Sequence, residues 1–476
     1  MTLLVFNTLS KRKELFEPLQ PPLVKMYVCG PTPYDHTHVG HVRTYISFDL
    51  IRRYLEFKGY SVYHVMNITD IDDKIIRKAK ELNVDWTEVP KKYTKEFLEV
   101  LNKLNIKLPH VMPKVTEHIK DIINFIKVLI DKGYAYESHG SVYFEVDKFP
   151  DYGKLSGITR REEWRQEEEV VREKKKPYDF ALWKKAKPGE PYWNSPWGPG
   201  RPGWHIECSV MSSRYLGRQF DIHGGGRDLI FPHHENEIAQ SEAYFGVKPW
   251  VKYWIHVGYL TIRGEKMSKS LGNIIPVHEV LSKYEPEVLR LYLLSTHYRS
   301  QLDFTWEGLE HTKSVMKRME NLVKLVKAYL EELEPPSRIP DNVGKTIEEL
   351  ERLRTGFFNA LDDDFNTTKA MPYLHKFISL ANKSLMGKPE YPIVVKVYEI
   401  LQDFNRVLGV LDKYLQPPLT PSENLVRELV KIIVEVRQIH RRRRDYEVAD
   451  WIRSELSKLG IKLIDKKDKT IWIIEG

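Results

Sequence analysis

The chain has 476 residues, of which 42% are apolar and 12% aromatic, so it can bury sizeable cores, and wholesale disorder is excluded. No run of 18 apolar residues occurs and MTLLVFNTLSKRK at the N-terminus is not a signal peptide, which excludes a membrane-spanning helix and gives no indication of export. A net charge of +8 fits a polyanionic partner without requiring one, and two cysteines exclude a disulfide scaffold.

The first part of the chain alternates predicted strands and helices. Lys25–Cys29 is a short apolar strand that runs into the loop Gly30–Pro33, and apolar residues at helical spacing follow from Val39 to Leu50. Ser61–Met66 is a second apolar strand with a predicted helix after it. This alternation predicts a parallel sheet with crossover helices, whose ligands bind beyond the carboxyl ends of the strands. We therefore expect chemistry in the loop after Cys29.

The character of the chain changes from about residue 116 to 200, where Gly, Pro, Trp and charged runs accumulate. The sheet pattern then returns with a predicted strand at Gln219–Ile222, a turn at Gly224–Gly226 and a helix at Pro232–Phe245. Beyond about residue 311 the chain is mostly amphipathic helix, and its last residues alternate like a small hairpin.

The motif His38-Val39-Gly40-His41 opens the helix after the first strand. A helix N-terminus offers free backbone N–H groups and the positive end of the helix dipole, which suit a phosphate. Gly40 leaves room for a flat base to approach the backbone, and two imidazoles three residues apart can face one anion. The alternative for this short pattern alone is two surface histidines in a polar loop.

The motif Lys266-Met267-Ser268-Lys269-Ser270 lies between Gly264 and Gly272. Two lysines three residues apart in a loop can hold a transferring phosphate chain by charge, and the nearby glycines suit a loop that opens and closes. The alternative for a lone lysine pair is a solvated basic turn.

A candidate zinc set consists of Cys29, Cys208, His233 and Glu237. The last two are four residues apart on a predicted helix and share one face, and two thiolates, an imidazole and a carboxylate are ligands that zinc accepts. The spacing leaves two alternatives open. The cysteines can be buried as small hydrophobic residues, or they can form a disulfide, which a cytosolic chain disfavours.

HVGH and KMSKS together resemble the two signature sequences of class I aminoacyl-tRNA synthetases, with one conservative change at Val39. Their order and the strand-then-helix context agree with that family. The resemblance implies an α/β fold with a Rossmann-type parallel-sheet catalytic domain. It also implies that the chain activates an amino acid with ATP and transfers it to the 3′ end of a tRNA.

Longer blocks resemble the cysteinyl-tRNA synthetase family over essentially the whole chain: KMYVCGPTPYDHTHVGH, NITDIDDKI, GRPGWHIECSVM, DIHGGGRDLIFPHHENEIAQSEA and EKMSKSLGN. The resemblance implies one zinc ion bound by Cys29, Cys208, His233 and Glu237. His234 is a rival ligand, but its i+4 neighbour is Ile238, so His233 is better placed to pair with Glu237.

The same resemblance implies the roles of the other site residues. The catalytic residues would be His38, His41, Lys266 and Lys269. ATP, together with Mg²⁺, would be bound by His38, Gly40, His41, Asp228 and Lys269. The cysteine pocket would be lined by Gly30, Thr69, Trp204 and His223.

Zinc would also explain how cysteine is selected. Shape alone gives roughly 10- to 200-fold discrimination per methylene-sized difference. A zinc ion that takes the substrate sulfur as a thiolate does better, because the hydroxyl of serine is a poor, hard ligand. No second hydrolytic site is then needed, so we interpret residues 116–200 as a connective insertion and not as an editing domain.

The expected domains follow from these boundaries: a catalytic domain in two halves at 1–115 and 201–257, the connective insertion at 116–200, a KMSKS-loop linking domain at 258–310, a helical tRNA-binding bundle at 311–415 and an anticodon-binding α+β domain at 416–476. Arg441–Arg444 either contact phosphates of the tRNA or form a solvated helix face. We expect a cytoplasmic monomer whose partners are ATP, L-cysteine and tRNA(Cys), with no membrane.

Two alternatives come from other classes of protein. A cysteine ligase that acts on an amino sugar, as in mycothiol biosynthesis, would share HVGH, KMSKS and the cysteines, but the long helical tail favours tRNA. A non-catalytic zinc- and RNA-binding module would not need intact HVGH and KMSKS motifs.

Overall fold

The computed structural model describes residues 2–158, 173–267, 271–336, 343–387, 389–415, 421–443, 445–459, 461–465 and 470–474. It divides into two compact units, Met1–Tyr414 and Leu415–Gly476. Within the described ranges, no helix combines the length and the apolar character that crossing a membrane requires.

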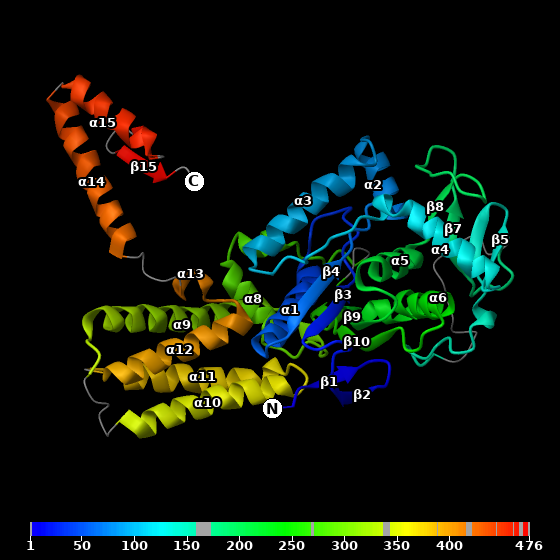
Figure 1. The fold of residues 1–476 in the computed structure, drawn as a ribbon, viewed down its shortest axis with the longest axis horizontal. Coiled ribbons are helices and arrows are strands. Elements are labelled where there is room, and N and C mark those ends of the chain that lie inside the picture. Colours follow the sequence, from blue (N-terminus) through cyan, green and yellow to red (C-terminus); the bar gives the residue numbers. More distant parts are fainter. Residues whose placement is uncertain are drawn as a thin grey trace. The chain divides into compact units, whose positions relative to one another are not determined.

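The core of the first unit is a parallel four-stranded sheet in the order β10-β9-β3-β4 (Figure 1). Its strands are β3 (Leu23–Val28), β4 (Ser61–Met66), β9 (Phe220–Gly226) and β10 (Val251–Val257). The helices α1 (Val39–Phe57) and α5 (Trp204–Leu216) pack against it, and α6 (Glu235–Phe245) packs against α5. The strands are buried almost continuously, as expected for a parallel sheet covered on both faces. The predicted α/β class and parallel sheet are confirmed.

The prediction of a turn at Gly224–Gly226 is wrong, because these residues form the end of β9 and pair with β10. A Cβ at Gly224 would clash with the ring of Phe48 on α1. The glycines therefore permit a close approach of helix to strand and do not reverse the chain.

The helix predicted from Pro232 to Phe245 begins differently. A π-helical turn, η6 (Ile230–His234), precedes α6, and Phe231 within it has extended backbone angles. The two histidines His233 and His234 therefore sit on an irregular turn, where regular helical spacing does not hold.

The insertion between β4 and β9 contains a second, antiparallel sheet in the order β5-β6-β7-β8. Its strands are β5 (Ala135–Ser138), β6 (Ser141–Phe144), β7 (Phe180–Lys185) and β8 (Gly200–Pro202). Three helices precede this sheet: α2 (Asp73–Leu82), α3 (Glu88–Lys103) and α4 (Ile119–Asp131).

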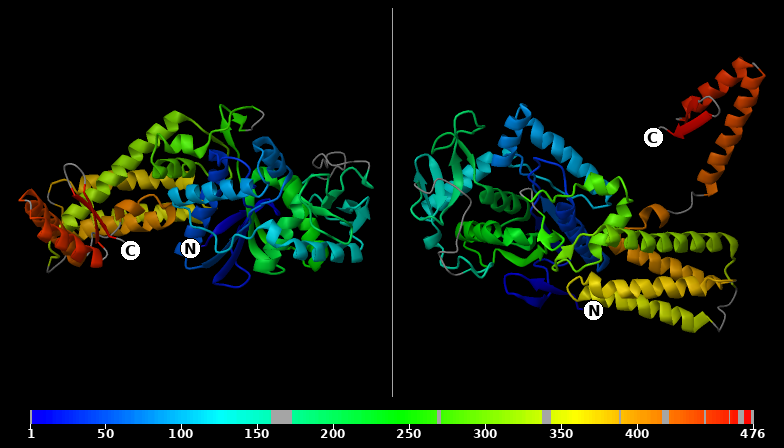
Figure 2. Two further views of the ribbon diagram at one scale, coloured as in Figure 1. Left: turned by 90° about the horizontal axis from the view of Figure 1, so that it is seen from above. Right: turned by 180° about the vertical axis from the view of Figure 1, so that it is seen from behind.

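The remainder of the first unit links the sheet to a helical bundle. The linking part contains β11 (Leu260–Ile262), β12 (Glu265–Lys266), α7 (Val277–Leu281), α8 (Pro286–Leu294) and β13 (Leu302–Asp303). The long bundle helices lie side by side (Figure 2) and are α9 (Trp306–Glu332), α10 (Gly344–Asp362), α11 (Thr367–Ser384) and α12 (Tyr391–Leu408). The short helix α13 (Asp412–Leu415) follows, and a hairpin of β1 (Leu4–Asn7) and β2 (Arg12–Leu15) opens the chain.

The second unit is a small α+β fold. It contains α14 (Pro421–Arg442), α15 (Tyr446–Lys458) and the hairpin of β14 (Ile461–Asp465) and β15 (Thr470–Ile474). Its own apolar core includes Val430, Val434, Ile452 and Leu456. The alternating pattern at the end of the chain correctly predicted the hairpin.

Candidate active site

The HVGH motif stands at the N-terminus of α1, beyond the carboxyl end of β3. His38 is the N-cap, and its Nδ1 accepts the backbone N–H of His41 at 3.3 Å. The two imidazoles stack with centroids 3.5 Å apart and planes inclined by 25°. A Cβ at Gly40 would lie 3.1 Å from Nδ1 of His38. Both rings thus lie together at the positive end of a helix, where an anion is stabilised.

The described start of the KMSKS motif lies next to HVGH. Met267 approaches Gly40, with its Cε 3.7 Å from where a Cβ of that glycine would stand. Just after the motif, the N–H of Val39 donates to the carbonyl of Ile275 at 3.0 Å, and the N–H of Val277 donates to the carbonyl of Thr37 at 2.9 Å. Lys266 ends β12, while Lys269, the second predicted lysine, lies outside the described residues.

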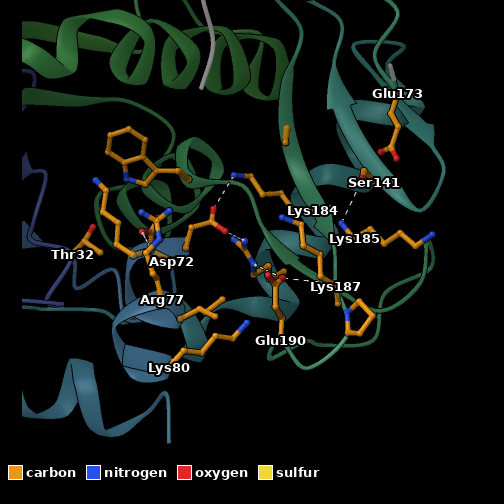
Figure 3. A pocket seen from close by; sticks show the side chains of 18 of the residues that line it. Thr32, Asp72, Arg77, Lys80, Ser141, Glu173, Lys184, Lys185, Lys187 and Glu190 are labelled. Carbon is orange, nitrogen blue, oxygen red and sulfur yellow. Dashed lines mark hydrogen bonds and ion pairs between the residues drawn. The ribbon is translucent and has the colours of Figure 1, made fainter. Parts of the chain in front are cut away.

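A cavity of about 820 Å³ lies between α2 and the sheet of the insertion. Arg77 and Lys80 enter it from α2, and Lys184 and Lys185 enter it from β7 (Figure 3). Seven basic and four acidic side chains line it, so its walls favour an anionic ligand. Trp204, at the start of α5, lines the cavity as well. Sequence reasoning missed this cavity, because it depends on two segments far apart in the chain.

The four predicted metal ligands come together beneath the carboxyl ends of the central strands. Cys29 follows β3, Cys208 lies on α5, His233 lies in η6 and Glu237 is in the first turn of α6. All four are buried, and one ligand atom from each lies within 4.8 Å of the others. The two sulfurs are 3.9 Å apart, and Nε2 of His233 is 3.0 Å from Oε1 of Glu237.

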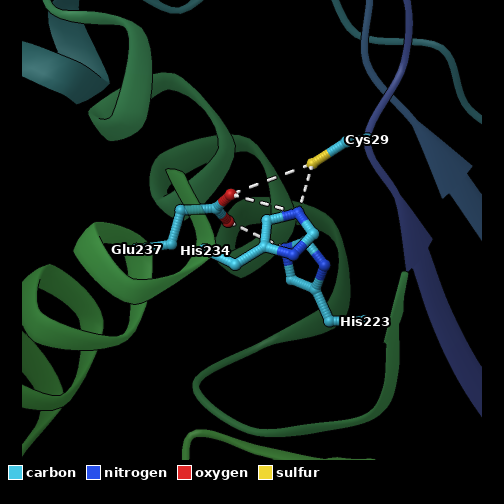
Figure 4. A group of neighbouring side chains, drawn as sticks. All are labelled: Cys29, His223, His234 and Glu237. Atoms are coloured by element: carbon cyan, nitrogen blue, oxygen red, sulfur yellow. Dashed lines mark hydrogen bonds and ion pairs between the residues drawn. The ribbon is translucent and has the colours of Figure 1, made fainter. Parts of the chain in front are cut away.

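A second set of ligands overlaps the first: Cys29, His223, His234 and Glu237 (Figure 4). Nε2 of His234 is 3.2 Å from the sulfur of Cys29, and Nε2 of His223 is 2.8 Å from Oε2 of Glu237. The i+4 argument had set His234 aside, but the irregular turn brings it within reach. Spacing along a regular helix cannot anticipate that position.

Two more histidines, His205 and His256, contact the histidines of this cluster, and sequence reasoning missed both. Nδ1 of His233 lies 2.8 Å from Nδ1 of His205, and Nδ1 of His234 lies 2.8 Å from Nε2 of His256. Such contacts fix which ring nitrogen of each histidine faces a metal. The only signal available in the sequence was the density of histidines around these positions.

Burial and charge set the protonation of the cluster. Burial raises the pKa of Glu237, but His223 and His233 outweigh this effect and hold the pKa at about 2. Burial lowers the pKa of His233, yet Glu237 and Cys208 raise it to about 10. The hydrogen bond with Cys29 lowers the pKa of Cys208 to about 6, against the opposite effect of burial. Burial and Cys208 together raise the pKa of Cys29 well above its usual value. Of the two thiols, that of Cys208 is therefore the more readily ionised.

The residues predicted to line the cysteine pocket have these contacts. The N–H of Gly30 donates to Oδ1 of Asn67 at 2.8 Å, and a Cβ at Gly30 would clash with the backbone of Asn67. The hydroxyl of Thr69 donates to Glu207 at 3.3 Å. Nδ1 of His223 is buried and, within the described part of the chain, lacks a hydrogen-bond partner.

The last two predicted residues are Trp204 and Asp228. The ring of Trp204 stacks on that of His233, which places this side chain next to the cluster. Asp228 lies in the turn after β9, close to Gly226. The HVGH motif and Cys29 follow β3 and Asp228 follows the neighbouring parallel strand β9, so all three lie at the carboxyl edge of the sheet.

Comparison with known proteins points in one direction. Residues 15–314 match the family described as "tRNA synthetases class I (C) catalytic domain", and residues 356–412 match the DALR domain. The cysteine–tRNA ligases of Staphylothermus marinus and Aeropyrum pernix are each 54% identical to the chain, over 98% of it and 98% and 99% of their own lengths. That of Pyrococcus horikoshii is 52% identical over 99% of both chains.

Among solved structures, methionyl-tRNA synthetase of Mycobacterium tuberculosis in complex with methionyl-adenylate superposes with a TM-score of 0.61. The match covers 86% of this chain and 93% of that one at 16% identity. A likeness at this identity speaks for the fold alone.

Proposed function

The chain belongs to the cysteinyl-tRNA synthetase family, and we propose that Cys29, Cys208, His233 and Glu237 hold the zinc ion with which it selects its amino acid. As a cysteine–tRNA ligase it activates L-cysteine with ATP, releasing pyrophosphate, and transfers the cysteinyl group to the 3′ end of tRNA(Cys). The remaining question is what each residue contributes.

The observation that carries the zinc proposal is the convergence of four buried ligand atoms within 4.8 Å. Two sulfurs, one imidazole nitrogen and one carboxylate oxygen suit zinc, and soft sulfur ligands disfavour magnesium or calcium. A zinc ion bound there supplies a position that takes the sulfur of cysteine as a thiolate and discriminates against the hydroxyl of serine.

His233 is the better ligand of the two neighbouring histidines. It belongs to the set that includes both sulfurs, and its Nε2 faces the same Glu237 oxygen that completes that set. His223 engages the other oxygen of Glu237 at 2.8 Å, so it orients the carboxylate. His234 is then not a ligand, and its ring is held in place by the contact with His256.

Activation takes place at the N-terminus of α1. The carboxylate of cysteine attacks the α-phosphate of ATP, and negative charge develops on the phosphates. His38, His41, Lys266 and Lys269 stabilise that charge, which is worth most in a site prepared before the reaction. Gly40 leaves room for the adenine, Asp228 lies near the adenosine, and Mg²⁺ enters on the phosphates of ATP.

The pocket residues orient cysteine for this attack. Gly30 keeps the chain tight against Asn67, while Thr69, Trp204 and His223 line the space above the cluster. The buried Nδ1 of His223 is a polar atom that a polar group of the substrate can engage.

The helical bundle of residues 311–415 and the second unit contact the tRNA, with the last 60 or so residues binding the anticodon. Arg441 pairs with Asp465 at 2.7 Å, so part of its charge is already neutralised. Arg442 and Arg443 are exposed on the same segment, while Arg444 lies outside the described residues. We therefore expect the phosphate contacts to come mainly from Arg442 and Arg443.

The amino-sugar ligase is not favoured, because the relatives that match are tRNA ligases over nearly the whole length of the chain. A binding module without activity is excluded by the same comparison. That the chain acts as a cytoplasmic monomer remains a prediction from its sequence.

X-ray absorption at the zinc edge tests the zinc proposal. Purified protein should hold one zinc per chain with two sulfur neighbours at about 2.3 Å. Adding cysteine should raise the sulfur count to three, while adding serine should leave it at two, since both protein cysteines are already ligands. Absent zinc, or a count of two with bound cysteine, would refute selection through the thiolate and leave the family assignment intact.

A further inference from the structure

A third group of metal-ligating side chains meets away from the buried cluster. His36 lies in the loop before HVGH, Glu96 on α3 and His278 on α7. One ligand atom from each lies within 4.8 Å of the other two. The three residues come from separate elements, so the fold alone brings them together.

Two of these side chains are already oriented. Nδ1 of His36 lies 2.8 Å from Oε2 of Glu96, and the N–H of Thr37 donates to Oε1 of the same carboxylate at 3.4 Å. The rings of His36 and His278 lie 5.1 Å apart, inclined by 71°. The ring of Tyr93 packs edge-on against His36 with centroids 5.5 Å apart, which limits the rotation of that imidazole.

The chemistry of this group differs from that of the buried cluster. It contains no sulfur, both histidines are exposed and Glu96 is half-buried, so an ion can enter with its water. Imidazole and carboxylate ligands suit zinc, cobalt and nickel. Ligand atoms about 2.0 to 2.2 Å from one ion are roughly 3 Å apart. Nδ1 of His36 and Oε2 of Glu96 are near that spacing, and a ring nitrogen of His278 lies within 4.8 Å of both ligand atoms.

We propose that His36, Glu96 and His278 form a second, solvent-accessible site for a divalent transition-metal ion, which ties the start of HVGH to the segment after KMSKS. The backbone already links these segments, since Val277 donates to Thr37 and His38 pairs with Pro276. The ion adds a side-chain link beside that pairing. It restrains the chain where the segment after KMSKS enters α7.

Metal titration tests the site. Untagged protein with its buried cluster occupied is titrated with Co²⁺ in a buffer that does not bind metals. We expect one further ion per chain, with weak visible bands and no thiolate charge-transfer band. His36→Ala, Glu96→Gln and His278→Ala should each weaken binding at least tenfold. His311→Ala, a matched change of an exposed histidine on α9, should not.

Three results would overturn the proposal: no further ion, binding that persists unchanged in all three variants, or a charge-transfer band that places the added cobalt on sulfur. Hydrogen exchange tests the link itself. Zn²⁺ should slow exchange in residues 36–41 and 275–281 of the intact chain and not in His278→Ala. Unchanged exchange with the second ion bound would show that the ion does not join the two segments.

Discussion

The indole of Trp204 stacks on the imidazole of His233, with ring centroids 4.1 Å apart and planes inclined by 28°. Trp204 also lines the basic cavity beside α2, so one side chain contacts both the cavity and the buried cluster. A ligand that moves Trp204 in the cavity would therefore also change the stacking contact with His233, the proposed metal ligand.

Substitutions of Trp204 measure how much its stacking on His233 contributes to cysteine binding. An aromatic pair contributes about 0.5 to 1.5 kcal/mol, which is roughly a 2- to 13-fold effect. Trp204→Ala should raise the KM for cysteine in ATP–pyrophosphate exchange by about that factor, and Trp204→Phe should recover most of it. Zinc content should stay at one per chain in both variants. Loss of zinc from Trp204→Ala would instead assign the residue a role in holding the ion.

Lys269 should act on the transition state more than on binding. Its partner charge develops only as the carboxylate attacks ATP, so Lys269→Ala should lower kcat for exchange by roughly 100- to 1,000-fold. Cysteine binding, measured directly, should change little. Lys283→Ala, at an exposed lysine after α7, is the matched control. Equal losses of binding and of rate in Lys269→Ala would argue against a transition-state role.

Local patterns explain why much of this site was predictable. Cys29 ends an apolar run and His38 caps a helix, and both features are visible in a few consecutive residues. The i+4 spacing predicted the His233–Glu237 pair. It could not show that His234 lies near Cys29, because the i+4 rule assumes a regular helix, whereas η6 is a π-helical turn with an extended residue, Phe231. Gly224 was taken for a turn because its partner, Phe48, lies on a distant segment. Contacts between residues far apart in the chain produce no regular spacing in the sequence, so they could not be predicted from it.

Removing the second unit should separate the two reactions. The units Met1–Tyr414 and Leu415–Gly476 each have their own core, so a chain ending at residue 414 should fold. It should keep cysteine-dependent exchange within about twofold, because the motifs and the cluster lie in the first unit. Charging of tRNA(Cys), measured with labelled cysteine, should fall much further. Full charging by the truncated chain would contradict an anticodon-binding role for the second unit.

Acid should weaken the contact between α1 and α8. Burial raises the pKa of Asp49, but Arg290 and Arg53 outweigh it, so the pKa lies below its usual value. A carboxylate with a lowered pKa stabilises the fold above the unfolded value of about 3.9, and this stabilisation is lost as the pH falls through the lower folded value.

Asp49→Asn leaves the buried guanidinium of Arg290 without its counter-ion, which should cost about 3 to 5 kcal/mol at pH 7. Guanidinium unfolding should show this difference shrinking below about pH 4, where the carboxylate of the parent chain becomes protonated. Glu279→Gln, at an exposed carboxylate, should show no such trend. A difference that is the same at pH 7 and pH 3 would mean that Asp49 acts through its shape and not its charge.

Cys208→Ser tests whether metal binding and amino-acid selection are one property. Cys208 is buried on α5 with its sulfur 3.9 Å from that of Cys29, and a serine hydroxyl fits the same space but ionises reluctantly and binds zinc poorly. Zinc content should fall well below one per chain, and the preference for cysteine over serine in exchange should fall with it.

Residual exchange at saturating cysteine should persist in this variant, because HVGH and KMSKS are unchanged and lie on different elements. Ser213→Ala, on the same helix and outside the cluster, should keep both zinc and discrimination. If Cys208→Ser loses zinc but still rejects serine as the parent chain does, the shape of the pocket selects cysteine, and the ion serves the fold. If it keeps one zinc per chain, the ion is held by the set drawn in Figure 4, which is Cys29, His223, His234 and Glu237.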